Sequence, residues 1–357
     1  MGRQNATDAA VRHIERTTSR RFPVAPTALV AGPRIRLETG DLDQPYFGAS
    51  IDKVLIATLI AQLGDEGVLT PETPIGELLP SNDIEHLPAA PHVDSARDIT
   101  VDHLLSHTSG LPDVCDPPRG EQSECSLAML EQHPERPWTS ESMLQQARGM
   151  RPIAAPGARF HYSDTGYLLL TRIIEEAAGV AFAQRLRSHI VEPAGMQTAA
   201  EWVGASAERL AELAPALAPF WFTKPHQELS QAFASKLTWQ SGLGGAASAH
   251  GLLAFQRALH AGDLCSREWV DHMSRPRNRK LGGLHYGAGM ATLKFEGFMP
   301  LLRGLPRPVG GLGILATHMF YYPAHDTHVI LNFHSFKRMN ASFSTHIRLA
   351  RLIKAHG

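Results

Sequence analysis

The strongest pattern in the chain is the helical spacing of apolar residues. From Ser50 to about Leu63 the apolar positions recur at this spacing, and Gly64 and Gly67 offer a stop. Residues 1–20 indicate a helix or a loose arm. The same spacing predicts helices over four further stretches: 166–179, 180–196, 248–263 and 341–356.

Strand-like patterns stand towards the two ends of the chain. Residues 24–47 alternate weakly around turns, and the runs YGAGMATLKF, GILATHMFYYP and HVILNFH follow residue 284. Between them, residues 71–160 are rich in proline and loops, apart from the short helical piece TVDHLLSHTSG. Strands at both ends with helices between them predict an α+β fold, in which both termini build one sheet and a helical insertion forms a cleft over it. We expect residues 1–65 and 245–357 to form the sheet region and residues 66–244 the mostly helical region.

Composition narrows the class of protein. The 357 residues are 43% hydrophobic, enough for one large core or two smaller ones. A net charge of −1 does not indicate the excess of positive charge that is typical of proteins that bind nucleic acid or an anionic membrane. There is no run of about 18 apolar residues that would span a membrane, and the polar first 22 residues lack the apolar segment of a secretory signal. We therefore expect a cytoplasmic protein, or one whose signal has been trimmed.

The cysteines and histidines do not predict a metal or disulfide framework. Cys115 and Cys125 lie in one polar loop and could pair in an oxidising compartment, whereas Cys265 would stay single. His103 and His107 are four residues apart, which places them on one face of a helix, but no cluster has zinc-like spacing. We expect no metal and no cofactor.

Ser50 and Lys53 form the candidate chemistry at the start of the first strong helix. Serine is a preferred N-cap and a first-turn lysine can simply face water, so the pair is compatible with plain capping. Three residues also make nearly one turn, which puts both side chains on one face beside the free amides of a helix N-terminus. A desolvated lysine there can accept the hydroxyl proton. Of the seven lysines, only Lys53 has a serine three residues before it.

The order of downstream segments favours the chemical interpretation. After SxxK come VDHLLSHTSGLPD (101–113), PGARFHYSDTGYLLLTRIIEEAAG (156–179), HIVEPAGMQTAAEWVG (189–204), SGLGGAASAHGLLAFQRAL (241–259) and VGGLGILATHMFYYP (309–323). This series resembles the serine β-lactamase-like superfamily, in the branch of class C β-lactamases, D-aminopeptidases and family VIII esterases. The likeness runs from about residue 45 to residue 335, and LLSHTSGLP and YSDTGYLLL are its most specific markers. It implies a β-lactamase/transpeptidase-like fold with an antiparallel sheet flanked by helices, forming one catalytic unit.

The resemblance also implies roles for three residues. Ser50 would form an acyl-enzyme, Lys53 would help remove its proton, and Tyr162, from the YxN block, would relay protons to the leaving group. A tyrosine with an ordinary pKa of about 10 is a poor base alone, but a neighbouring ammonium makes its phenolate more accessible.

The chain departs from the family at the third residue of YxN, which is Asp164. An ionised carboxylate accepts hydrogen bonds but cannot donate one, as asparagine does. It would also favour the protonated form of Lys53 and weaken it as a base. Either the site works differently, or Asp164 is held protonated, or it binds a cationic group. We hypothesise that Asp164 contacts a substrate amine or positions Lys53.

The second departure is in the third family block, at Gly311, Leu312 and Gly313. The cation and hydroxyl usual there commonly help to hold a substrate carboxylate, and their loss argues against β-lactam hydrolysis and carboxypeptidase action. The glycines suit a strand edge that approaches a ligand, although GGLG can also be a simple turn. By the family pattern, the amides of Ser50 and Ile314 would form the oxyanion hole.

These features predict a serine hydrolase that cleaves a small ester or amide, such as a D-amino-acid amide or peptide or a short acyl ester. An acyltransferase that passes the acyl group to an amine or alcohol is the alternative, and a catalytically silent binding protein is a third interpretation. The expected partner is a small acyl substrate, with no nucleic acid and no membrane. The sequence does not indicate the oligomeric state.

Overall fold

The computed structural model describes residues 3–19, 22–90, 96–236 and 244–357. Within them, one antiparallel sheet has the strand order β2-β1-β10-β9-β8-β7-β6-β5, and β3 pairs with β4 apart from it. The strands are β1 (Thr27–Ala31), β2 (Arg36–Thr39), β3 (Tyr46–Phe47), β4 (Ala246–Ala247), β5 (Asn278–Leu281), β6 (Leu284–Tyr286), β7 (Ala291–Leu293), β8 (Val309–Gly313), β9 (Thr317–Tyr322) and β10 (Thr327–Asn332).

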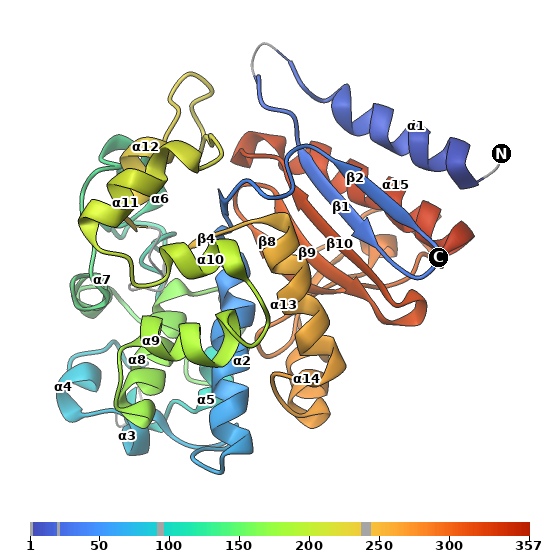
Figure 1. The fold of residues 1–357 in the computed structure, drawn as a ribbon. Helices are drawn as coiled ribbons and strands as arrows, with labels where there is room; N and C mark the ends of the chain where they lie inside the picture. Colours follow the sequence, from blue (N-terminus) through green and yellow to red (C-terminus); the bar gives the residue numbers. More distant parts are fainter. Residues whose placement is uncertain (1–2, 20–21, 91–95, 237–243) are drawn as a thin grey trace.

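Helices cover both faces of the sheet and build a second part beside it (Figure 1). The long ones are α1 (Arg3–Glu15), α2 (Asp52–Asp65), α8 (Asp164–Ala178), α13 (Ala249–Ala261) and α15 (Met339–His356). The shorter ones are α3 (Ile75–Leu78), α4 (Ser81–Ile84), α5 (Val101–Leu105), α6 (Leu127–Gln132), α7 (Ser140–Arg148), α9 (Phe182–Leu186), α10 (Gln197–Trp202), α11 (Ala207–Leu213), α12 (Ser230–Phe233) and α14 (Arg267–Ser274). None of these helices is both long and apolar enough to cross a bilayer.

Alternation along β1 shows how the two faces are filled. Ala28 and Val30 are buried in the layer under α1 and α15, whereas Leu29 faces the core that contains α2 and α13. Successive side chains of a strand point to opposite faces, so a strand covered on both sides is apolar throughout. Helix α2 lies between the sheet and the helical part and is buried along most of its length, which explains its continuous apolar run.

The predicted α+β fold with an antiparallel sheet from both chain ends is confirmed. Element boundaries differ in places. The run GILATHMFYYP is broken by a turn after Gly313, which separates β8 from β9, because Ala316 takes a left-handed conformation with φ of 61°. Only Ala291–Leu293 of YGAGMATLKF forms a further strand, because a turn closed by the hydrogen bond from the Gly287 amide to the Met290 carbonyl folds the chain back, so that β7 pairs with β6.

Candidate active site

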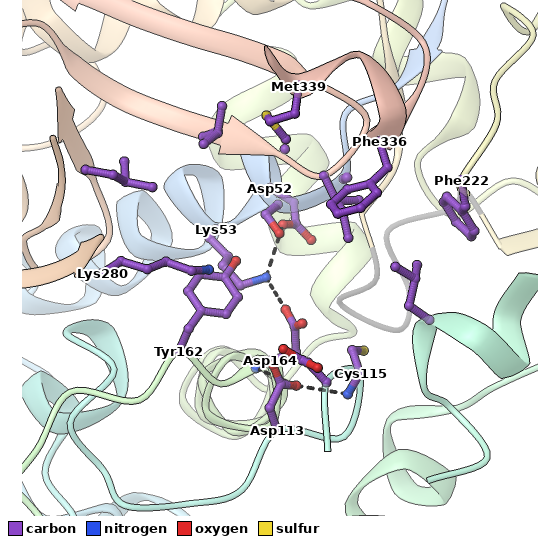
Figure 2. Close-up of a pocket in the computed structure, with 18 of the residues that line it drawn as sticks. Asp52, Lys53, Asp113, Cys115, Tyr162, Asp164, Phe222, Lys280, Phe336 and Met339 are labelled. Carbon is purple, nitrogen blue, oxygen red and sulfur yellow. Dashed lines mark hydrogen bonds and ion pairs between the residues drawn. The ribbon is translucent and has the colours of Figure 1, made fainter. Parts of the chain in front are cut away.

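A cavity of about 680 Å³ lies where the N-terminal end of α2 meets the end of β8 (Figure 2). It brings together most of the residues that the sequence singled out. Those on its wall are Ser50, Lys53, Tyr162, Asp164, Leu312, Gly313 and Ile314. Gly311 lies behind the wall, where a Cβ atom would be 3.1 Å from Cγ2 of Val54.

Ser50 sits in a 3₁₀ turn, Ala49–Ile51, that leads into α2. Helix α2 therefore begins two residues after the predicted start at Ser50. The Ser50 side chain makes no capping hydrogen bond to the N-terminus of the 3₁₀ turn or of α2. Ala49 has φ of 51°, a left-handed conformation that residues with a side chain adopt uncommonly. The plain capping interpretation of Ser50 thus has no hydrogen bond to support it.

Strand β8 fixes this turn from the other side. Thr317 Oγ1 donates a hydrogen bond of 3.0 Å to the Gly48 carbonyl, which ties β9 to the residue before Ala49. A Cβ on Gly313 would overlap both of these groups. Glycine at 313 is therefore required for β8 to approach the turn so closely, and this packing brings Ile314 and Ser50 to the same wall.

Lys53 is buried, with 5% of its surface exposed, and forms an ion pair with Asp164. The carboxylate of Asp52 lies 4.0 Å away. Burial by itself lowers the pKa of the Lys53 amine, but Asp164, the Tyr162 oxygen and Asp52 outweigh it and raise that pKa well above its usual value. Lys53 is consequently an ammonium group at neutral pH.

Tyr162 lies between two groups that hold its ring. The His107 imidazole stacks on it with 4.2 Å between centroids, and the Lys280 ammonium lies 3.7 Å from its centroid. Burial raises the pKa of the Tyr162 phenol well above its usual value, while Lys53 and a hydrogen bond with Ser50 act in the opposite direction. The resting tyrosine is therefore a neutral phenol in contact with the Ser50 hydroxyl.

The loop that contains HTSG holds the tyrosine segment in place. His107 Nδ1 accepts from the Ser163 amide at 3.2 Å, and Ser163 Oγ donates to the Pro112 carbonyl at 3.0 Å. The Asp164 amide donates to Asp113 Oδ1 at 3.3 Å. Burial lowers the pKa of His107 well below its usual value, which keeps the ring neutral and able to accept. The two most specific sequence markers are thus bonded to each other.

His103 has a separate structural task from His107. Its Nδ1 accepts from the Thr100 amide at 3.1 Å, while the Thr100 hydroxyl accepts from the His103 amide, so the two form a capping box on α5. The four-residue spacing of these histidines therefore serves two different hydrogen-bond networks.

Sequence reasoning missed four charged groups on the cavity wall: Asp52, Asp113, Asp116 and Lys280. Burial raises the pKa of Asp52 to about 7 and that of Asp113 to about 8. Asp52 lies within the SxxK motif and Asp113 directly follows LLSHTSGLP, so both motifs offered a local signal for these aspartates. Lys280 has no local signal, because only pairing of the distant strand β5 brings it here.

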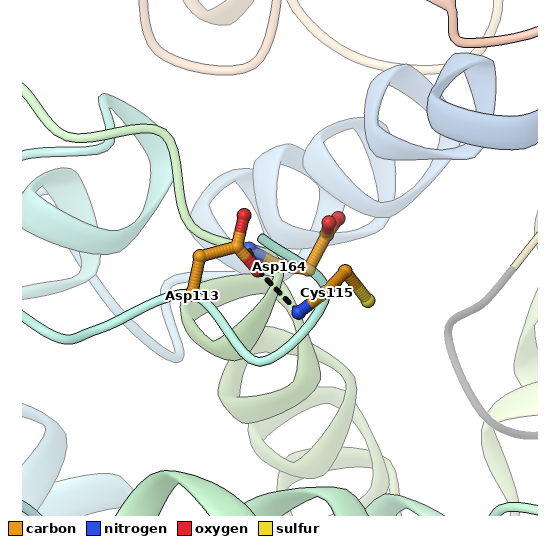
Figure 3. A group of neighbouring side chains, drawn as sticks. All are labelled: Asp113, Cys115 and Asp164. Carbon is orange, nitrogen blue, oxygen red and sulfur yellow. Dashed lines mark hydrogen bonds between the residues drawn. The ribbon is translucent and has the colours of Figure 1, made fainter. Parts of the chain in front are cut away.

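Asp113, Cys115 and Asp164 place one potential ligand atom each within 4.8 Å of one another (Figure 3). Asp164 is already paired with the Lys53 ammonium, and Asp113 accepts from the backbone amides of Cys115 and Asp164. The cluster therefore has internal partners for both carboxylates, and we assign no metal to it. All three cysteines, Cys115, Cys125 and Cys265, are free thiols.

Comparison with known proteins identifies the family. A family model described as beta-lactamase matches residues 15–352. The chain belongs to the beta-lactamase family. As a beta-lactamase family member it is 24% identical over 265 residues to the putative penicillin-binding protein PbpX of Bacillus subtilis (strain 168), covering 74% of this chain and 58% of that protein. The chain thus spans less than two thirds of that curated relative.

Solved structures share the fold of this beta-lactamase family chain at low identity. D-amino acid amidase from Ochrobactrum anthropi SV3, complexed with L-phenylalanine amide, superposes with a TM-score of 0.74 at 18% identity, covering 99% of both chains. EstCE1, described as a hydrolase with promiscuous acyltransferase activity, has a TM-score of 0.74 at 17% identity and covers 97% of this chain and 98% of its own. The predicted membership of the serine β-lactamase-like superfamily is confirmed.

Proposed function

We propose that this protein is a serine hydrolase that cleaves a small ester or amide through an acyl-enzyme on Ser50. The observation that carries the proposal is the shared cavity wall of Ser50, Lys53 and Tyr162, in which Tyr162 is hydrogen-bonded to Ser50 and Lys53 is an ammonium held by Asp164. A nucleophile in contact with a proton carrier, beside a fixed positive charge, is the arrangement that acyl transfer needs.

In the proposed first step, Ser50 Oγ attacks the substrate carbonyl carbon, and its proton passes to the Tyr162 oxygen in step with the departure of the phenol's own proton, so that the tyrosine oxygen carries partial negative charge during the transfer. Tyr162 gives its own proton to the leaving oxygen or nitrogen as the carbonyl–leaving-group bond breaks, so the phenol is neutral again at the end. The Lys53 ammonium stabilises the negative charge that develops on the tyrosine oxygen during the transfer. Water then attacks the acyl-enzyme, and the same relay runs in reverse to release the acid and restore Ser50.

The oxyanion of the tetrahedral intermediate would be held by the amides of Ser50 and Ile314. Support comes from the tight packing of β8 on the turn at Ser50, which puts both residues on one wall of the cavity. Backbone donors fixed in this way are worth several kcal/mol, about 3 kcal/mol per donor, in the transition state.

The wall composition supports a substrate with an apolar part. Aromatic and aliphatic residues dominate it, among them Phe47, Phe160, Phe222, Phe233, Leu127 and Leu130. A short acyl ester or a D-amino-acid amide fits this lining. The superposable structures include an enzyme described as a D-amino acid amidase and one described as a hydrolase, both of which agree with this substrate range.

Acyl transfer to an organic acceptor is the second candidate. The same apolar lining would favour an alcohol or amine over water at the acyl-enzyme, and EstCE1 is described as having promiscuous acyltransferase activity. Adding a primary alcohol to an ester assay distinguishes the two, because a transferase forms a new ester in place of the free acid.

The test is to treat the protein with a fluorophosphonate and measure its intact mass. We expect a single adduct, mapped by peptide digestion to Ser50, and no adduct in Ser50→Ala. Ester hydrolysis should fall by at least about 1,000-fold in the same variant. Ser188→Ala, which removes an exposed serine hydroxyl on another part of the surface, is the matched control and should react like the parent. An adduct elsewhere, or full turnover by Ser50→Ala, would overturn the proposal.

A further inference from the structure

Lys280 is a positive charge in the cavity that the proposed mechanism does not use. It lies on β5, the last strand of the sheet, and its ammonium is 3.7 Å from the centroid of the Tyr162 ring and 5.9 Å from that of Tyr286. Figure 2 shows its side chain reaching from the sheet across Tyr162. Among the described residues no carboxylate lies within ion-pair distance of this ammonium, unlike that of Lys53. Its three N–H donors are free to meet a ligand.

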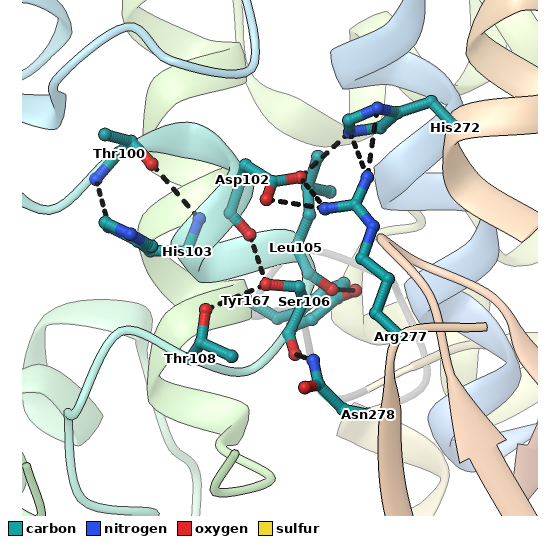
Figure 4. A network of polar contacts seen from close by, with 10 residues as sticks. All are labelled: Thr100, Asp102, His103, Leu105, Ser106, Thr108, Tyr167, His272, Arg277 and Asn278. Carbon is teal, nitrogen blue, oxygen red and sulfur yellow. Dashed lines mark hydrogen bonds and ion pairs between the residues drawn. The ribbon is translucent and has the colours of Figure 1, made fainter. Parts of the chain in front are cut away.

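A network of polar contacts holds the start of β5 in place (Figure 4). Arg277 binds both oxygens of Asp102 at 2.8 and 2.6 Å, and His272 contacts the same carboxylate at 2.8 Å. Asn278 donates to the Ser106 carbonyl at 3.2 Å. An edge strand would otherwise be free to move, so these bonds hold the backbone that carries Lys280, whose solvent-exposed side chain extends to the Tyr162 ring.

The acidic groups nearby do not neutralise Lys280 by contact. Asp164 pairs with Lys53, and Asp113 accepts from two backbone amides with its pKa raised by burial to about 8. Asp116 is exposed at the edge of the cavity. The wall near Tyr162 and Lys280 therefore offers a cation without a bound anion.

We infer that Lys280 binds a carboxylate of the substrate and so supplies, from a different strand, the positive charge that Gly311 does not provide in the third family block. This inference rests on the proposed function, because it names a substrate class for the same Ser50 site. Substrates would be acyl compounds with an anionic group on the part that lies beside Tyr162. A charge-assisted hydrogen bond at the cavity wall would select them over neutral analogues.

The test uses two pairs of esters, each with one neutral and one anionic member. In the first pair, 4-nitrophenyl pentanoate and mono-4-nitrophenyl glutarate, the carboxylate is on the acyl part. In the second pair, phenyl acetate and 3-acetoxybenzoate, it is on the leaving group. We expect the parent to prefer one anionic member, and Lys280→Met to lower the ratio of kcat/KM for that member over its neutral partner by about 10- to 100-fold. Arg279→Met removes a charge from the neighbouring residue of β5, which is not on the cavity wall, and should keep the parent ratio. A parent without preference for either anionic ester, or an unchanged ratio in Lys280→Met, would overturn the inference.

A binding measurement separates this inference from the proposed function. In Ser50→Ala, which cannot form the acyl-enzyme, calorimetry should detect mono-4-nitrophenyl glutarate or 3-acetoxybenzoate, and adding Lys280→Met should weaken that binding about 10-fold or more. Equal binding in the single and double variants contradicts the role of Lys280, even where hydrolysis by Ser50 is established. Loss of the fluorophosphonate adduct contradicts the proposed function alone.

Discussion

At the scale of single residues, Asp164 best illustrates how a family departure changes the chemistry. An asparagine there would leave Lys53 with a neutral partner, whereas the carboxylate makes a direct ion pair with it. Two roles for Asp164 are hypothesised from the sequence: contact with a substrate amine and positioning of Lys53. The ion pair with Lys53 supports the second role. In the mechanism that we propose, Lys53 therefore acts as a fixed ammonium, and Tyr162 relays the proton.

The first prediction concerns the pH dependence of Asp164→Asn. Because Asp164 raises the pKa of Lys53, removing its charge lowers that pKa, so the ammonium is lost at a lower pH. We expect the alkaline limb of the kcat/KM profile to move to lower pH. Asp263→Asn, which removes an exposed carboxylate outside the cavity, is the control and should keep the parent profile. Superimposable profiles for Asp164→Asn and the parent would contradict the ammonium role of Lys53.

At the scale of elements, the site depends on how closely β8 approaches the 3₁₀ turn before α2. The turn carries a left-handed alanine, and its carbonyl at Gly48 is held by Thr317 from the sheet. A glycine in β8 makes this contact possible. The block that lacks the family's usual cation and hydroxyl thus packs closely on the turn, which is the packing on which the proposed oxyanion hole depends.

The second prediction follows from this packing. In Gly313→Ala the new methyl group would overlap Thr317 Oγ1 and the Gly48 carbonyl, so the turn that carries Ser50 must shift. We expect a loss of about 1–3 kcal/mol in the free energy of unfolding and a larger relative loss in kcat. Urea unfolding and ester kinetics measure the two effects. Gly149→Ala is the control, because its Cβ would meet its nearest neighbour at 3.5 Å with φ of −81°, and stability should stay within about 0.5 kcal/mol. Parent-like kcat in Gly313→Ala would contradict the account.

At the scale of the whole molecule, the cavity wall is assembled from the sheet, the central helix and the helical part. The Asp102–His272–Arg277 network joins α5, in the helical part, to α14 and to the residue that precedes β5 at the edge of the sheet. Tyr162 comes from the segment before α8, Ser50 from the turn before α2, and Lys280 from β5. Contacts between these parts therefore decide the shape of the site.

The third prediction tests the contact between the helical part and the edge of the sheet at Asp102. Burial raises the pKa of Asp102, but the hydrogen bonds from His272 and Arg277 outweigh burial and lower it. The contribution of the Asp102 carboxylate to stability is therefore present above its unfolded pKa of about 3.9, and it is lost as pH falls through the folded pKa. Asp102→Asn should lower the free energy of unfolding at pH 7 by about 1–3 kcal/mol. The difference from the parent should shrink in urea titrations at acid pH. Glu38→Gln, in the exposed pair with Arg36, should cost less than about 1 kcal/mol. A constant difference at all pH values would contradict the ionic role.

The sequence by itself determined the helices with a strong apolar period, the α+β class and the family to which the chain belongs, since these depend on local spacing and on markers of linear order. It could also place Tyr162 and Asp164, which stand in one short block. Only the tertiary structure decided that Lys53 pairs with Asp164, that His107 and Lys280 contact the Tyr162 ring, and that Asp113 is buried beside them. Strand pairing and burial bring together residues from 55 to 118 positions apart, such as His107 and Tyr162 or Tyr162 and Lys280, and the charge of each group depends on those neighbours.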